Sequence, residues 1–352
     1  MIDHDRHLLD TRQQQVGTAC VWRRLGREEK QGKKYNHQVS LTAGGATPVR
    51  WARSLASRLP LPTATKQPQK NPSMKSQSRI LIAGCGYIGC CAAEQLRDHG
   101  HQVFGARRDI TQLPDGIQPV AIDLLQDNYD ALPNDLDAIV WALAPQPGEA
   151  GYQAAYVDAP ARLLRHLAAR GDNIARAVLV ASTSVWHVED GSYVDEQSPA
   201  CPRGFRGELV LAGEQVFQAS AFRSISLRLA GIYGPGRTSM LERIASGDAA
   251  PPDHAVFGNR IWRDDAARAI SHTLALADPS PTYAVVDDDP ADLRSVYAWL
   301  AEQLNVELPA AAPTFRGRGG SKRIRNQHLR ASGWRPEVRD YREGYARLLA
   351  ER

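Results

Sequence analysis

The chain has 352 residues, of which 43% are hydrophobic and 23% are charged, ordinary proportions for a globular protein. No stretch approaches the roughly 18 uninterrupted apolar residues that a membrane-spanning helix needs, so we expect no membrane association. Five cysteines without Cys-x-x-Cys spacing argue against a disulfide framework or a zinc site, and they favour a reducing, cytoplasmic compartment.

The net charge of +4 is unevenly distributed along the chain. Residues 1–73 hold 13 of the 43 Lys and Arg and 5 of the 39 Asp and Glu, so they carry +8 while the remainder carries −4. Because the remainder is mildly acidic, its charge gives no case for nucleic-acid binding.

The first 73 residues are polar, and prolines are concentrated over residues 60–73, as in an unfolded linker. Three interpretations stay open. These residues are an upstream extension from a misassigned start, with Met74 as the initiator; a disordered basic tail; or an organellar transit peptide. The first is favoured because Met74 lies five residues before the first expected strand.

From residue 79 the pattern alternates between strands and helices. Strands are expected over residues 79–83, 101–106, 118–122, 136–143, 175–181 and 224–229, and helices over 87–99, 152–170 and 206–217. This alternation predicts an α/β fold, a doubly wound parallel sheet of the Rossmann type. We expect a dinucleotide-binding domain over residues 74–230 and a smaller, mixed C-terminal lobe over 231–352 that returns segments to the main sheet.

A dinucleotide-binding signature directly follows the first strand, with the sequence Gly84-Cys85-Gly86-Tyr87-Ile88-Gly89. The first glycine permits a tight turn, the second lets backbone N–H groups approach a pyrophosphate, and the third lets helix and strand pack closely. We therefore predict that the cofactor is bound by Gly84, Gly86, Tyr87, Ile88 and Gly89.

The end of the second strand bears on which dinucleotide is bound. An acid there holds the ribose 2′-OH of NAD, but this chain has Arg107 and Arg108 before Asp109. A guanidinium suits a 2′-phosphate by charge and by bidentate geometry, which favours NADP over NAD. In the alternative interpretation both arginines are solvated and Asp109 contacts the ribose.

Two further segments at strand ends are candidate cofactor contacts. Asp123 and Leu124 follow the third strand and could frame the adenine, or Asp123 could cap the next turn. The small-residue segment Ala142-Leu143-Ala144 closes the fourth strand at the carboxyl edge of the sheet, where ligands bind in open α/β folds.

The order of motifs resembles the extended branch of the short-chain dehydrogenase/reductase superfamily, the NAD-dependent epimerase/dehydratase group, over about residues 79–350. Besides the glycine signature and Asp123-Leu124, the resemblance rests on Ser182-Thr183-Ser184-Val185-Trp186, Val194-Asp195-Glu196 with Ser198-Pro199, Leu227-Arg228-Leu229-Ala230-Gly231-Ile232-Tyr233-Gly234-Pro235-Gly236, and Asn259-Arg260-Ile261-Trp262-Arg263-Asp264-Asp265. Segments 283–288 and 322–326 resemble the YeeZ-like bacterial subgroup.

The resemblance implies a catalytic hydroxyl at Ser182 and a Tyr-x-x-x-Lys pair on the next helix. Aligned on the Glu-Gln end of that helix, the Tyr position falls on Arg206 and the Lys position on Val210. Val210 cannot ionise, and Arg206 is a poor acid at neutral pH. Three tyrosines, Tyr152, Tyr156 and Tyr193, are either substitutes for the proton donor or structural residues.

Two functions follow from this departure. The first is an NADP(H)-dependent oxidoreductase or epimerase-type enzyme that uses Ser182 with a relocated proton donor. The second is a dinucleotide-binding regulator or redox sensor without turnover. In related enzymes the region of the basic, glycine-rich segment 316–325 helps to bind an anionic substrate, often nucleotide-linked, and a homodimer through two helices is common.

Overall fold

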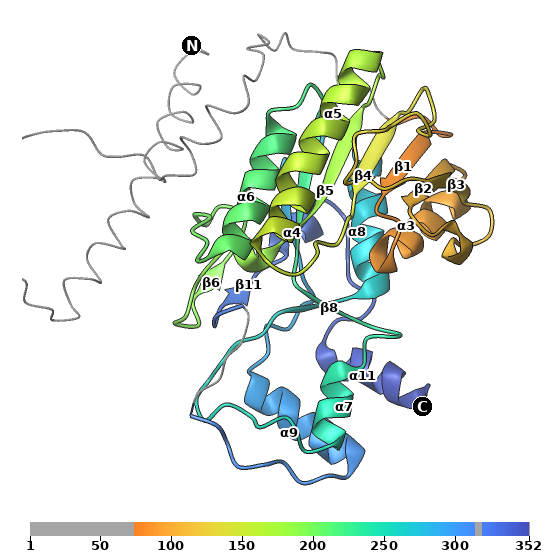
Figure 1. The fold of residues 1–352 in the computed structure, drawn as a ribbon. Helices are drawn as coiled ribbons and strands as arrows, with labels where there is room; N and C mark the ends of the chain where they lie inside the picture. The colour runs from red at the N-terminus through yellow and green to blue at the C-terminus, as the bar shows by residue number, and fades with distance from the viewer. Residues whose placement is uncertain (1–73, 314–318, 352) are drawn as a thin grey trace, which may run out of the picture. The chain divides into compact units, whose positions relative to one another are not determined.

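The computed structural model describes residues 74–313 and 319–351; the expectations for residues 1–73 lie outside this part of the chain. Seven parallel strands form the main sheet in the order β10-β7-β5-β4-β1-β2-β3 (Figure 1). The strands are β1 (Arg79–Ala83), β2 (Gln102–Arg107), β3 (Gln118–Ala121), β4 (Ala138–Trp141), β5 (Arg176–Ser182), β7 (Ser224–Leu229) and β10 (Thr282–Val285). This arrangement confirms the doubly wound α/β fold that the sequence predicted.

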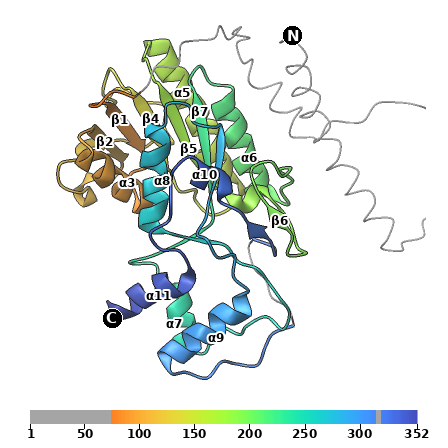
Figure 2. The same cartoon turned by 180° about the vertical axis from the view of Figure 1, so that it is seen from behind.

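Helices cover both faces of this sheet, so its central strands are apolar on both sides. All four residues of β4 are buried, as are four of the five in β1. On one face lie α5 (Ala159–Arg170) and α6 (Phe205–Gln218), and on the other α8 (Arg263–Ala275) and α10 (Gln327–Ala331) (Figures 1 and 2). α3 (Tyr87–Asp98) packs against α8, and together with the sheet they bury one continuous apolar cluster.

The segment expected as one helix over residues 152–170 is three consecutive pieces. α4 (Glu149–Gln153) leads into a π-helical turn (Ala154–Asp158), which leads into α5. Pro160 stands in the first turn of α5 and has no N–H to donate to the carbonyl of Tyr156, which explains the change of pitch. The Tyr156 carbonyl instead approaches Gly213 of α6, where an added Cβ would lie 2.6 Å from the oxygen.

The C-terminal part of the chain contributes to two places. It supplies β10, which pairs with β7 in the main sheet, and it builds a second apolar cluster around α7 (Ser239–Ala245), α9 (Leu293–Leu304) and α11 (Tyr341–Ala350). Two small parallel pairs complete the strands described: β6 (Tyr193–Val194) with β11 (Arg323–Ile324), and β8 (Gly231–Tyr233) with β9 (Arg260–Trp262). Within residues 74–313 and 319–351, no helix is both long enough and apolar enough to cross a membrane.

Candidate functional site

The glycine signature lies between β1 and α3 and is tightly packed at two of its three glycines. Gly84 has φ +90°, and a Cβ added there would lie 2.5 Å from the backbone nitrogen of Leu143. A Cβ on Gly89 would lie 2.7 Å from the carbonyl oxygen of Gly84. Gly86, in contrast, has open space beside it, with its nearest neighbour 4.0 Å away. This is the space that a close approach of a phosphate to the backbone requires.

Arg107, the last residue of β2, reaches back to this loop. Its Nη1 donates to the carbonyl of Cys85 at 3.1 Å, and its Nη2 donates to Gln112 Oε1 at 3.0 Å. The Asp109 carboxylate instead accepts hydrogen bonds from the backbone N–H and the hydroxyl of Thr111, at 3.0 and 2.6 Å. These hydrogen bonds lower the pKa of Asp109. The guanidinium, and not the carboxylate, is therefore the group placed beside the glycine loop.

The other predicted cofactor residues lie near the same sheet edge. Asp123 accepts a hydrogen bond from the backbone of Leu125 at 3.1 Å, the capping contact that one interpretation predicted. Leu124 is buried and Arg108 is exposed. Ala142 donates its N–H to Ala83 at 2.8 Å, which holds the end of β4 against the start of the loop.

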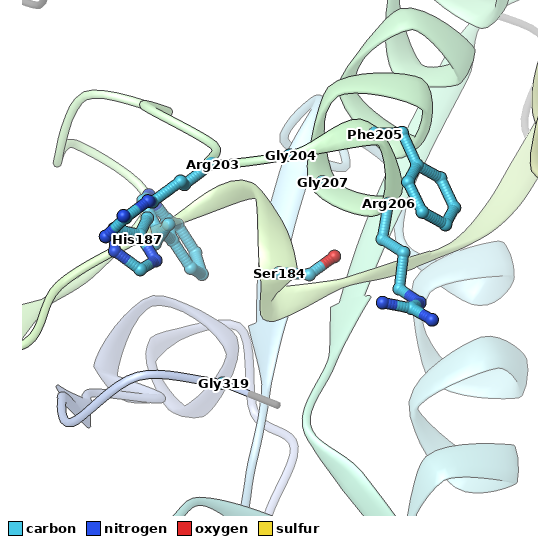
Figure 3. Close-up of a pocket in the computed structure, with 9 residues that line it drawn as sticks. Ser184, His187, Arg203, Gly204, Phe205, Arg206, Gly207 and Gly319 are labelled. Atoms are coloured by element: carbon cyan, nitrogen blue, oxygen red, sulfur yellow. The ribbon is translucent and has the colours of Figure 1, made fainter. Parts of the chain in front are cut away.

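A pocket opens where β5 ends. The Ser182 hydroxyl accepts from the backbone of Ser184 at 3.1 Å and so caps a short 3-10 turn, Thr183–Val185. The pocket lies beside this turn and the start of α6 (Figure 3), and its lining consists of Ser184, Trp186, His187, Arg203, Gly204, Phe205, Arg206, Gly207 and Gly319. A Cβ on Gly207 would lie 2.4 Å from the Ser184 carbonyl, so glycine lets α6 approach the turn.

Arg206 and Val210, the residues aligned with the family's Tyr and Lys, have different surroundings. Arg206 is exposed and lines the pocket, and its side chain and the Ser184 hydroxyl lie on the same side of the 3-10 turn (Figure 3). Val210 is 1% exposed and packs in the interior. A cation and an apolar side chain thus lie at the two residues that the sequence analysis aligned with the Tyr and Lys.

The three candidate tyrosines are separated by the fold. Tyr152 packs edge-on against Phe205, a pocket residue, with ring centroids 5.6 Å apart. Tyr156 is buried, and burial raises its pKa far above the ordinary range of a phenol. Tyr193 on β6 lies beneath the guanidinium groups of Arg323 and Arg325, at 4.2 and 4.5 Å. Of the three, Tyr152 is placed nearest to the pocket lining by a ring contact.

One charged residue beside the pocket was not singled out by its sequence context. Lys322 is 3% exposed, and its Nζ donates to the carbonyl of Gly319, a pocket residue, at 2.6 Å. This ammonium forms no ion pair with a carboxylate among the described residues, and burial lowers the pKa of Lys322 to about 8. Its sequence neighbours are basic, and nothing in that pattern marks this lysine as the buried one.

A buried ion pair lies next to the pocket. Arg228 of β7 donates to both carboxylate oxygens of Glu214 on α6, at 2.8 and 2.7 Å. The side chains are 8% and 1% exposed, and the guanidinium lies 4.5 Å from the ring centroid of Trp186. The pair therefore joins a strand, a helix and a pocket residue.

The parallel sheet, the glycine loop and the pocket at the carboxyl edge define a nucleotide-binding fold of the short-chain dehydrogenase/reductase type. No protein-family model matches the chain. A solved structure from Methylobacillus flagellatus, described as an NAD-dependent epimerase/dehydratase, is 32% identical, with a TM-score of 0.67 over 78% of this chain and 98% of that one. The chain belongs to the NAD-dependent epimerase/dehydratase family. The resemblance to the YeeZ-like subgroup stays a prediction.

Two other similar proteins carry different descriptions. A 3-diazoavenalumate denitrifying reductase of Streptomyces sp. is 25% identical over 309 residues, which cover 76% of this chain and 99% of that protein. MoeE5, solved in complex with UDP-glucuronic acid and NAD, is 22% identical, with a TM-score of 0.59 over 76% of this chain and 96% of that one. The likeness to MoeE5 is a likeness of fold alone.

Proposed function

We propose that the chain binds NADP(H) across the glycine loop and acts as an oxidoreductase or epimerase-type enzyme with an altered proton donor. The observation that carries the choice of cofactor is the Arg107 guanidinium, held beside the loop by the Cys85 carbonyl while Asp109 is turned to Thr111. A fixed guanidinium at the end of β2 favours the 2′-phosphate, because charge-assisted bidentate hydrogen bonds are strong and directional.

The residues proposed to hold the cofactor lie at or just after the ends of β1, β2, β3 and β4. The name of the family and the NAD bound in MoeE5 support a nicotinamide dinucleotide as the coarser assignment. The proposed contacts are Gly84, Gly86, Tyr87, Ile88 and Gly89 in the loop, Arg107 and Arg108 at the ribose, Asp123 and Leu124 at the adenine, and Ala142, Leu143 and Ala144 along β4. When bound, the cofactor supplies hydride transfer chemistry.

The reacting end is proposed to lie at the turn after β5. The Ser182 hydroxyl can orient a substrate oxygen by a hydrogen bond, the role of the family's hydroxyl residue. Arg206 stands where a tyrosine would deliver a proton, and its guanidinium stabilises negative charge on oxygen but does not release a proton at neutral pH. We infer that the proton comes from Tyr152 or from water in the pocket.

The charges around the pocket favour an anionic substrate. Arg206 and Arg203 line it, and the Lys322 ammonium lies buried at its edge without a carboxylate partner among the described residues. A buried ammonium is costly unless an anion compensates it, so a phosphate or carboxylate group of the substrate would be stabilised there. The UDP-glucuronic acid bound by MoeE5 carries both kinds of group.

A second candidate function is a dinucleotide-binding regulator or redox sensor without turnover. The observation that favours it is the burial of Val210, the residue that the sequence alignment places at the family's lysine, together with Arg206 at the expected tyrosine. The two candidates agree on cofactor binding and differ only in turnover.

Cofactor titrations test the proposal at Arg107. We expect Arg107→Ala to weaken NADPH binding by about 10- to 100-fold, the loss of charged hydrogen bonds of about 1.5–3 kcal/mol, and NADH binding by less than about 3-fold. Arg165→Ala, an exposed arginine on α5, is the matched control and should change neither. Equal losses for NADPH and NADH would refute the NADP assignment.

Turnover separates the two candidates. NADPH oxidation with aldehydes and ketones, and product analysis of nucleotide sugars incubated with NADP⁺, should together identify an accepted substrate. Ser182→Ala should lower kcat by about 100-fold without changing the Kd for NADPH. An unchanged rate in Ser182→Ala would refute the catalytic assignment. Tight NADPH binding with no turnover across the panel would favour the regulator.

A further inference from the structure

Two thiols face each other across the glycine loop. Cys85 lies inside the loop and Cys90 lies in the first turns of α3, and their Sγ atoms are 3.7 Å apart. Both are free cysteines. The Cys90 thiol also donates to the Cys85 carbonyl at 3.3 Å, which fixes its side chain toward the loop.

The two sulfurs differ in exposure and in charge environment. Cys85 is 0% exposed, and a Cβ added to Gly105 of β2 would lie 3.2 Å from its Sγ. Cys90 is partly exposed, and Arg107 Nη1 lies 4.0 Å from its sulfur. The hydrogen bond with Cys85, aided by the Arg107 charge, lowers the pKa of Cys90 to about 7, and the same hydrogen bond raises that of Cys85. Cys90 is therefore the nucleophilic thiol and Cys85 the one that resolves it.

The next residue in the same helix, Cys91, has surroundings that make its thiol unreactive. It is buried, and its Sγ lies 2.9 Å from the Asp264 carboxylate. Burial, together with this carboxylate, raises the pKa of Cys91 to about 12. Reactivity is thus expected at one of two adjacent cysteines, and Cys91 serves as the internal control.

We propose that Cys85 and Cys90 form a reversible disulfide that lowers the affinity of the glycine loop for its dinucleotide. The oxidant is a small disulfide such as oxidised glutathione. The Cys90 thiolate attacks one of its sulfurs and expels a glutathione thiolate. The Cys85 thiol then attacks the Cys90 sulfur, and its proton passes to the second glutathione as that thiolate is expelled. Two protein thiols are oxidised and one small disulfide is reduced to two thiols.

The cross-link would distort the loop because two of its three glycines are already tightly packed. Closing the bond brings the sulfurs from 3.7 Å to about 2.0 Å and encloses the four residues 86–89, whose N–H groups would face the pyrophosphate. Gly84 and Gly89 already approach backbone atoms so closely that an added Cβ would clash. The Cys85 carbonyl, which holds Arg107, would move with its residue.

Dinucleotide and oxidation are therefore coupled in both directions. If the disulfide weakens dinucleotide binding tenfold, bound dinucleotide must disfavour the disulfide by the same factor, a shift of about 30 mV for a two-electron couple. NADP⁺ is the suitable probe, because unlike NADPH it cannot itself reduce a disulfide.

The experiment uses the full chain in glutathione redox buffers, with and without saturating NADP⁺. Alkylation and peptide mapping follow the state of residues 85, 90 and 91 separately, and calorimetry gives the Kd for NADP⁺ before oxidation, after oxidation and after re-reduction. We expect a linked 85–90 peptide, at least a tenfold rise in Kd that reduction reverses, and NADP⁺ shifting the midpoint to more oxidising buffers. Cys85→Ser should stop at one glutathione adduct on Cys90, and Cys91→Ser should behave as wild type.

Three results would overturn the proposal: no linked 85–90 peptide, adducts at Cys91 as readily as at Cys90, or a linked peptide with an unchanged Kd. The coupling to affinity rests on the proposed function, and the two can fail separately. A reduced protein that binds no NADP⁺ refutes the cofactor assignment and with it the proposed coupling, while the peptide map still shows whether the two thiols pair.

Discussion

The Glu214–Arg228 pair offers a sharp test of how the pocket is supported. Glu214→Gln keeps the size of the side chain but removes its charge, which leaves the Arg228 guanidinium buried without an anion. Breaking one partner of a buried, bidentate pair costs about 3–5 kcal/mol. With an unfolding entropy of about 2.1 cal/mol/K per residue, a domain of roughly 270 residues should lose about 5–9 °C in Tm.

Chemical and thermal denaturation of the reduced protein at pH 7 would measure this loss. Glu208→Gln on the same helix is the matched control. Glu208 forms no ion pair with any residue that the structure describes, and the loss in this variant should stay below about 1 kcal/mol. The double variant Glu214→Leu with Arg228→Met removes both charges and should be more stable than Glu214→Gln alone. A Glu214→Gln variant within about 1 kcal/mol of wild type would refute the reasoning, because the guanidinium would then have found another partner.

Three further predictions concern the loop, the buried lysine and the pocket. Gly84→Ala should lower dinucleotide affinity by more than about tenfold, because its Cβ would lie 2.5 Å from the Leu143 backbone. Gly100→Ala is the control, since Gly100 has φ +88° but no neighbour within 4 Å. In the same titration it should lose stability and keep its affinity. Burial lowers the pKa of Lys322 from 10.5 to about 8, so the unfolded chain binds the extra proton between these values. The free energy of unfolding of wild type, measured relative to Lys322→Met by denaturation at a series of pH values, should therefore rise by on the order of 3 kcal/mol between pH 8 and 10.5. This added stability is lost again as the pH falls from 10.5 through 8. A difference between the two proteins that does not change with pH would contradict the burial of the ammonium. Gly207→Ala should impair turnover but not the Kd for NADPH, because its Cβ would push α6 from the Ser184 carbonyl and not from the glycine loop; a raised Kd would contradict the separation of the two sites.

Local sequence patterns predicted the central sheet well. Strands β1 and β7 begin and end where the apolar runs do, and the glycine signature lies between a strand and a helix as expected. These features depend on neighbouring residues, namely apolar periodicity and glycine backbone freedom. Pro160 is a local signal for the break in the helix expected over residues 152–170, but apolar spacing alone does not detect it.

Features that depend on distant residues were not predictable. Glu214 and Arg228 are fourteen residues apart on different elements, and their burial as a pair follows only from the packing of α6 on the sheet. Lys322 belongs to a basic segment in which Arg323 and Arg325 lie over an aromatic ring, whereas the Lys322 side chain is buried.

The return of β10 to the main sheet has a consequence for synthesis and for truncation. β7 pairs with β10 along one edge, and α8 packs on the sheet and on α3 within one apolar cluster. Both α8 and β10 come from residues 263–285. A fragment ending near residue 230 would expose β7 as an edge and leave that apolar face open. The main sheet therefore completes its fold only after most of the chain has left the ribosome, and a fragment meant to bind the cofactor should extend beyond β10 to include α10, whose Leu329 belongs to the same apolar cluster.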